Sequence, residues 1–174
     1  MLNQEGWGFI HGEADIKILI LYILRRLPAP IDAEALAELV LIDNGLDYFE
    51  YKHYLSELVE TAHVEESDGL YSVTAKGSRN GEVLESSLPY SVRKKADRAA
   101  KPVAEAMRRR AMILANHEKG ENGVTVYLAL SDGVGSILDL RLLAPNEAQA
   151  EKMEKNFRLR AEDYYNRIAE LLSE

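Results

Sequence analysis

Basic side chains are concentrated in one stretch of this chain, and they are the groups whose chemistry is easiest to name. Residues 89–119 hold nine Lys/Arg against three Asp/Glu, whereas residues 1–88 hold six against sixteen. Cations at helical spacing can neutralise a row of phosphates. These cations are Arg93, Lys94, Lys95, Arg98 and Lys101, followed by Arg108-Arg109-Arg110. The stretch predicts either a phosphate-binding surface or a set of ion pairs with the acidic N-terminal half, in the same chain or in a partner subunit.

A second group of side chains lies at the start of a helix predicted over 48–62. Its members have the donors and apolar groups that contact base edges in the major groove. They are Tyr48, Phe49, Lys52, His53 and Ser56, and nearby acids that would repel phosphates are Asp47, Glu50, Glu57 and Glu60. The hairpin tip at 66–69 carries no cation, so Lys76 and Arg79 are the nearest substitutes. The alternative is a solvated structural helix whose aromatic side chains pack inward.

The sequence contains few residues in patterns typical of catalysis, metal binding or cofactor binding. The chain has no Cys, and its four His have no second ligand at a metal-binding spacing. It has no phosphate-binding glycine loop before a helix and no Ser, His and acid arrangement. We therefore expect no enzyme activity, no cofactor and no metal. The N-terminus has no basic segment of a signal peptide, and the longest apolar run, 18–24, is too short to span a bilayer. These features favour a cytoplasmic protein.

The first half of the chain predicts short alternating elements. They are helices at 16–24, 33–41 and 48–62, a strand at Ile31, strands at 64–67 and 70–73, and a short helix after Thr74. Asp32 and Thr74 are expected N-caps, and Asp43-Asn44-Gly45 is an expected turn. Gly81 and Pro89 are expected to weaken and then stop the short helix. A basic helix then begins near Ser91, with Pro102 as a kink or an end.

The second half predicts three strands and one long helix. The strands are at 107–116, 124–130 and 136–143, and Asn146 caps a helix to about Leu172. That helix would be roughly 40 Å long, which is longer than a three-stranded sheet is wide. We therefore expect a second subunit to cover the far part of its apolar stripe. The predicted dimerisation residues are Phe157, Tyr164, Ile168 and Leu171.

Several motifs resemble those of known regulators. The matching residues are 18–24, Tyr54-Leu55-Ser56-Glu57-Leu58, and the run from Asp68 to Gly77 that ends in Thr-Ala-Lys-Gly. They resemble the bacterial winged-helix regulators of the PadR and MarR type over roughly residues 13–85. Over nearly its whole length the chain is similar to a small, uncharacterised bacterial family of unknown function. The marks of that family are Tyr48-Phe49, Leu88-Pro89 and Phe157.

The expected fold is therefore α+β. It comprises a winged helix-turn-helix domain at 1–88, a basic linking helix at 89–105, and an antiparallel sheet with a long helix at 106–174. The last part would serve dimerisation or sensing.

The resemblance implies a cytoplasmic, homodimeric transcriptional regulator that binds double-stranded DNA. It supplies no known ligand, and sensing of an unknown small-molecule effector by the last part is an alternative to dimerisation. The third helix would enter the major groove while the basic helix holds flanking phosphates. The expected DNA contacts are Tyr48, Phe49, Lys52, His53, Ser56, Lys76, Arg79, Arg93, Lys94 and Arg98. The alternative is a winged-helix protein-protein interaction module without sequence-specific DNA binding. Its interface aromatics would be Tyr48, Phe49 and Tyr54.

Overall fold

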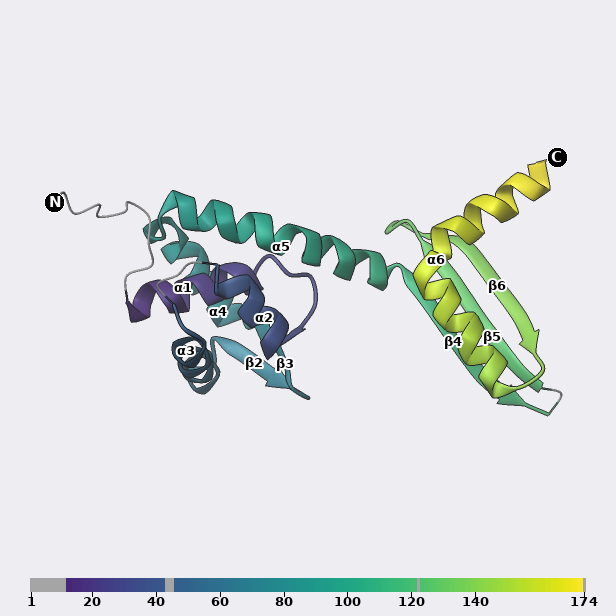
Figure 1. The fold of residues 1–174 in the computed structure, drawn as a ribbon, viewed down its shortest axis with the longest axis horizontal. Helices are drawn as coiled ribbons and strands as arrows, with labels where there is room; N and C mark the ends of the chain where they lie inside the picture. Colours follow the sequence, from purple (N-terminus) through teal and green to yellow (C-terminus); the bar gives the residue numbers. More distant parts are fainter. Residues whose placement is uncertain (1–11, 43–45, 122, 174) are drawn as a thin grey trace. The chain divides into compact units, whose positions relative to one another are not determined.

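A computed structural model describes residues 12–42, 46–121 and 123–173. The chain divides into two compact units, Met1–Met107 and Arg108–Glu174. The described residues form six α-helices, one short 3-10 helix and two three-stranded antiparallel sheets (Figure 1). The predicted α+β class is confirmed at this level. The turn predicted at 43–45 lies outside the described residues.

The first unit alternates helices with short strands. Its elements are α1 (Glu13–Leu24), β1 (Ile31–Asp32), α2 (Ala33–Val40), α3 (Tyr48–Glu60), β2 (Val64–Ser67), β3 (Leu70–Val73), α4 (Ala75–Leu84), the 3-10 helix η1 (Glu85–Ser87) and the greater part of α5 (Tyr90–Ala111). The sheet has the order β1-β3-β2, and Ile31 pairs with Tyr71. The predicted helices and strands up to Val73 agree with these bounds to within two or three residues.

Helix α1 is the centre of the core of this unit. From Ile18 to Leu24 every side chain is buried, which explains why its apolar positions are nearly continuous rather than confined to one stripe. Tyr51, Leu55 and Leu58 of α3 belong to the same core. No helix in the described ranges is both long enough and apolar enough to cross a membrane.

Local hydrogen bonds fix where the helices begin. The carboxylate of Asp32 accepts from the Ala35 amide at 2.9 Å, and the Thr74 hydroxyl accepts from the Gly77 amide at 3.0 Å. Both predicted N-caps are confirmed. At the start of α3, Asp47 and Glu50 exchange side-chain-to-backbone hydrogen bonds in a capping box. These two acids therefore have a structural role at the helix end.

The glycine at position 81, which was predicted to weaken its helix, lies within the helix and does not interrupt it. Helix α4 continues through Gly81 to Leu84. A Cβ at this position would lie 3.0 Å from the Arg25 Cδ and 3.2 Å from the Leu21 Cβ. The glycine therefore allows α4 to pack closely on α1.

Helix α5 is longer than predicted, and this corrects three boundaries. It runs through Pro102 to Ala111, so the linking helix does not end at residue 105. Consequently Arg108-Arg109-Arg110 form its last turn, not the approach to a strand, and the first strand begins at Ile113 rather than Met107. Cations in a last turn interact favourably with the negative end of a helix, which favours the continued helix in spite of Pro102.

The second unit is a sheet with a helix on one face. Strands β4 (Ile113–Gly120), β5 (Gly123–Ser131) and β6 (Ser136–Ala144) pair antiparallel in that order, followed by α6 (Glu147–Ser173). Side chains of β5 alternate strictly, with Val124, Val126, Leu128 and Leu130 buried. These residues form a core with Ala150 and Phe157 of α6. The predicted cap is confirmed, because Asn146 accepts from the Gln149 amide at 2.9 Å.

The last helix is not the single straight rod that the sequence predicts. The backbone at Arg160 has φ −141° and ψ 31°, so α6 consists of two segments joined by a kink (Figure 1). Ala150, Phe157 and Ala161 are buried in the unit. Beyond the kink, Leu171 is 64% and Leu172 is 83% exposed. The apolar stripe therefore continues past the residues that the sheet covers.

Candidate nucleic-acid interface

Helix α5 presents opposite chemistry on its two sides. Its buried side chains recur every four residues and are Val92, Ala96, Ala100 and Ala104. Lys94, Arg98 and Lys101 are all exposed, and their spacing of four and three residues places them on one face of the helix. We refer to these three residues as the basic face. Most of the predicted basic cluster therefore points to solvent.

The basic face makes few ion pairs within its own unit. Among the described residues, Lys94 and Arg98 pair with no acid of the N-terminal half, and Lys101 lies 4.0 Å from Glu105 of the same helix. Lys94 lies 5.8 Å from the ring centre of Tyr90, which is itself 69% exposed. The predicted alternative of pairing with the acidic half of the same chain therefore does not describe Lys94 or Arg98 among the described residues, and pairing with a partner subunit stays a prediction.

Two acids, one in α5 and one in η1 before it, pair with the arginines that directly follow α1. Arg25 donates to Glu85 at 2.9 Å, and Arg26 donates to Asp97 at 2.5 Å. The Tyr22 hydroxyl donates to the same Asp97 carboxylate at 3.0 Å. Burial, reinforced by this hydrogen bond, raises the pKa of Tyr22 to about 12, so the hydroxyl remains a donor at neutral pH. This network ties α5 to the residues that follow α1, and it uses neither Lys94 nor Arg98.

Arg93 occupies the boundary between the two sides of the helix. Its side chain is half-buried, and its Nε has no hydrogen-bond partner among the described residues. Its guanidinium carbon lies 6.0 Å from the centre of the Tyr90 ring. Arg93 is therefore less available to a partner than Lys94 or Arg98.

The residues of α3 that were predicted to contact DNA bases differ in their exposure and in their partners. The Tyr48 hydroxyl donates to Glu34 at 2.5 Å, and this hydrogen bond raises the pKa of Tyr48. His53 lies 3.4 Å from Glu57. Phe49 is 83% exposed, and Lys52 and Ser56 are also exposed. Of the predicted contacts on α3, Phe49, Lys52 and Ser56 are thus exposed, whereas the Tyr48 hydroxyl and the His53 ring each lie against a carboxylate.

Part of the negative charge that the sequence places on α3 is neutralised in the structure. Glu57 pairs with Lys17 of α1 at 2.6 Å, and this hydrogen bond lowers the pKa of Glu57. Asp47 and Glu50 form the capping box described above, although both are exposed. Glu60, which is also exposed, is the remaining acid on this helix. The helix still repels phosphates, but one of its carboxylates is compensated.

The two cations after the β2–β3 hairpin differ from each other. The Lys76 ammonium donates to the Thr61 carbonyl at 2.7 Å, where it satisfies the C-terminal end of α3. Arg79 is exposed on α4. Lys76 therefore has a structural role, whereas the exposed Arg79 can contact a phosphate.

The predicted dimerisation residues lie around the kink of α6. Phe157 is 2% exposed and stacks on Tyr164 with ring centres 6.1 Å apart. With Ile168 they line an apolar hollow of about 250 Å³ above Leu128, Leu140 and Leu142. Phe157 is therefore a core residue of its own unit, and Tyr164, Ile168 and Leu171 are the more accessible members.

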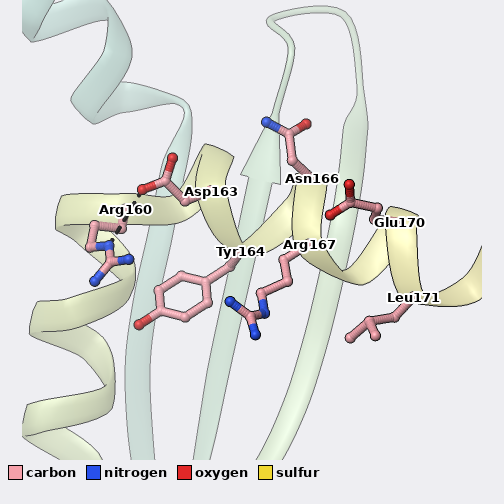
Figure 2. A pocket seen from close by; sticks show the side chains of 7 residues that line it. All are labelled: Arg160, Asp163, Tyr164, Asn166, Arg167, Glu170 and Leu171. Atoms are coloured by element: carbon pink, nitrogen blue, oxygen red, sulfur yellow. Dashed lines mark hydrogen bonds and ion pairs between the residues drawn. The ribbon is translucent and has the colours of Figure 1, made fainter.

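A second hollow, of about 790 Å³, lies along α6 after the kink. Figure 2 shows that its seven lining residues all come from this one helical segment, with Tyr164, Arg167 and Leu171 pointing to one side. Arg160 and Asp163 are joined by an ion pair of 3.3 Å. A hollow walled by one helix is an open surface, not an enclosed site for a small molecule.

Comparison with known proteins identifies the family. The sequence profile of the domain of unknown function DUF4364 matches residues 16–172. The chain belongs to the DUF4364 family. No curated protein and no solved structure matches it. The predicted relationship to an uncharacterised family is thus confirmed, and what this DUF4364 protein binds has to be argued from its own side chains.

Sequence reasoning missed one polar contact of this DUF4364 protein. Glu154 of α6 is 8% exposed and pairs with the Nδ1 of His117 on β4. The pair ties the helix to the sheet. The available signal was a carboxylate between Met153 and Phe157, within the apolar stripe. An acid at such a position is seldom fully buried unless it has a partner.

Proposed function

We propose that this DUF4364 protein is a DNA-binding transcriptional regulator of the winged-helix type that acts as a homodimer. The order α1-β1-α2-α3-β2-β3, with the three strands in one antiparallel sheet, matches the element order expected for a winged helix-turn-helix. In such a module the helix before the hairpin enters the major groove. The resemblance to PadR-type and MarR-type regulators supports the same function.

The observation that carries the proposal is the outward basic face of α5. Lys94 and Arg98 are exposed, lie four residues apart and pair with no acid of the N-terminal half among the described residues. Phosphate contacts supply most of the sequence-independent affinity of DNA-binding proteins. The basic face would therefore bind the phosphate backbone of the DNA and fix the position of the protein along the duplex.

Sequence reading would fall to α3. Lys52 and Ser56 can donate to base edges, and Phe49 can contact a thymine methyl group. Because Glu60 and the capping acids weaken phosphate binding by this helix, one module alone would bind DNA poorly. Two modules in a homodimer gain affinity when both engage the same duplex.

The second candidate function is a protein-protein interaction module without sequence-specific DNA binding. It is favoured by Phe49, which is 83% exposed beside the exposed acid Glu50. Exposed aromatic side chains are typical anchors of protein interfaces. An acidic rim around such an anchor would suit a basic partner.

Capture of genomic DNA fragments by the purified full-length protein tests the proposal. Fragments should be retained at low salt, and affinity should fall linearly with salt on logarithmic axes. The double variant Lys94→Gln/Arg98→Gln should reduce that slope by about 0.9 for each phosphate contact removed. The matched control Lys152→Gln/Lys155→Gln removes the same charge from α6 and should leave the slope unchanged.

Two results would count against the regulator. Retention of no fragment at low or moderate salt would overturn DNA binding in this form. Equal slopes for the α5 variant and the wild type would remove the basic face from the interface. Binding of a basic protein partner that is lost in Phe49→Ser, together with absent DNA retention, would favour the interaction module.

A further inference from the structure

Strand β6 is an edge of the sheet in the second unit. The sheet has the order β4-β5-β6, so one side of the β6 backbone has no strand partner in the described chain. The strand is nine residues long, and Ile137 is 41%, Leu142 is 41% and Leu143 is 66% exposed. A long apolar edge readily accepts another strand, and natural proteins usually protect such edges.

The opposite edge is protected in this way. Strand β4 carries His117, Glu118 and Lys119 toward its end, and Lys119 is exposed. Charges of this kind on an edge strand discourage pairing with another chain. Strand β6 also carries two charged residues, but Asp139 and Arg141 have opposite signs on either side of Leu140, so β6 is the edge that suits a second copy of itself.

The sequence of β6 is complementary to itself. In an antiparallel pair centred on Leu140, the residue before the centre faces the residue after the centre on the other strand. Asp139 then faces Arg141 of the second copy, and Arg141 faces Asp139 of the second copy. Further out, Leu138 faces Leu142 and Ile137 faces Leu143. Each of these cross-strand pairs joins groups that attract each other or that bury apolar surface together.

The observed register places these pairs on appropriate faces of the sheet. Leu140 pairs with Leu128, whose side chain is buried beneath α6, so Leu138 and Leu142 lie on that face as well. Asp139 and Arg141 lie on the other face, where both are exposed. The Ser136 hydroxyl donates to Asp139 at 2.7 Å, and the Arg141 guanidinium carbon lies 5.7 Å from the Tyr127 ring centre. The two charges are thus already held near the strand.

Helix α6 leaves part of the inner face beside β6 open. It packs chiefly on β4 and β5 and contacts β6 least (Figure 1). The hollow of about 250 Å³ between Leu140, Leu142 and Ile168 lies at this uncovered side. A second sheet that continues across β6 would extend the apolar face and cover the exposed part of Leu142.

We propose that a second copy of this chain pairs with β6 in antiparallel orientation, centred on Leu140, to form a continuous six-stranded sheet with two reciprocal Asp139–Arg141 ion pairs. The interface is isologous, since each copy contributes the same residues. The proposal goes beyond the homodimer of the proposed function by naming its surface. It does not depend on DNA binding.

Charge reversal tests this pairing without DNA. Asp139→Arg and Arg141→Asp each place like charges opposite one another twice in the dimer. Each should raise the dimer dissociation constant about tenfold or more, measured by analytical ultracentrifugation of the full chain. The double variant Asp139→Arg/Arg141→Asp restores both attractions in exchanged positions and should return the constant to within about threefold of the wild type.

A mixture of the two single variants gives the sharper result. One variant then presents two positive and the other two negative side chains, so the mixture should form heterodimers in preference to either homodimer. The fraction of heterodimer can be measured by the amount of untagged variant that a tagged variant retains in a pull-down. A melting temperature close to that of the wild type verifies that each single variant is folded.

Three outcomes would overturn the proposal. They are a wild-type protein that is monomeric at about 100 μM, single variants that dimerise as tightly as the wild type, and a mixture without preferential heterodimers. None of these depends on whether DNA binds. Failure of this interface and failure of DNA binding are therefore distinguishable.

Discussion

At the scale of single residues, the same side-chain type has different roles according to its neighbours. Lys17 neutralises Glu57, Lys76 satisfies the end of α3, and Lys94 points to solvent. Only the third is available for a phosphate at no structural cost. The glycines differ in the same way, because some leave open space where a Cβ would be and others do not.

Gly77 is the position where one added methyl group should cost most. A Cβ there would lie 2.0 Å from the carbonyl oxygen of His63, which is backbone and cannot turn away. We expect Gly77→Ala to reduce the free energy of unfolding by about 2 kcal/mol or more, measured by urea denaturation. Gly135→Ala is the control, since nothing lies within 4 Å of that position. It should change stability by less than about 0.5 kcal/mol, and equal effects would contradict the close contact.

At the scale of elements, a partly buried ion pair joins α6 to the sheet. His117 of β4 and Glu154 of α6 are paired through Nδ1 and Oε1, and Arg158 lies 3.3 Å from the other oxygen of Glu154. The hydrogen bond with Glu154 raises the pKa of His117 above its ordinary value of 6.5. The helix is therefore held to the sheet partly by a histidine whose protonated form is favoured by its partner.

This pair should make the stability of the second unit depend on pH. Because the pKa of His117 is higher in the folded than in the unfolded state, its protonation stabilises the fold. The contribution should be complete below about pH 6.5 and should be lost as pH rises through the raised pKa. The quantity to measure is the difference in unfolding free energy between wild type and His117→Gln from pH 5.5 to 8.5. A difference that stays constant over this range would contradict the prediction.

At the scale of the whole molecule, the chain consists of two compact units, to which the two proposals assign separate tasks. The first unit carries the basic face and α3, and the second carries the open edge of β6. In the proposed function, phosphate binding by one unit depends on dimerisation by the other. Neither unit alone would supply two DNA-binding modules.

Loss of the dimer should therefore weaken DNA binding without any change in the DNA-contacting residues. We expect Asp139→Arg to reduce the affinity for a duplex with two half-sites about tenfold or more, because avidity is lost. The double variant Asp139→Arg/Arg141→Asp should recover it. Fluorescence anisotropy measures the dissociation constants for a duplex with one half-site and for a duplex with two. An equal reduction in affinity for the two duplexes would show that loss of avidity is not the cause.

Local structure could largely be predicted from the sequence. The hairpin of β2 and β3 around Asp68-Gly69, the caps Asp32 and Thr74, and the alternating pattern of β5 all follow from interactions between residues close in the chain. The errors arose where local preference was not decisive. Pro102 did not end α5, and nothing in the apolar spacing of α6 indicated the kink at Arg160.

The sequence by itself determined the element order, the family and the self-complementary order of charges around Leu140. Only the tertiary structure decided which of these features a partner can reach. Arg26 pairs with Asp97 and Lys17 pairs with Glu57, although each pair is far apart in the sequence. These charges are neutralised by their partners, whereas Lys94 and Arg98 are exposed to solvent. The order of the strands made β6 an edge. The physical reason is that a charge or a strand acquires its role from the groups packed against it, and packing joins residues that no local pattern relates.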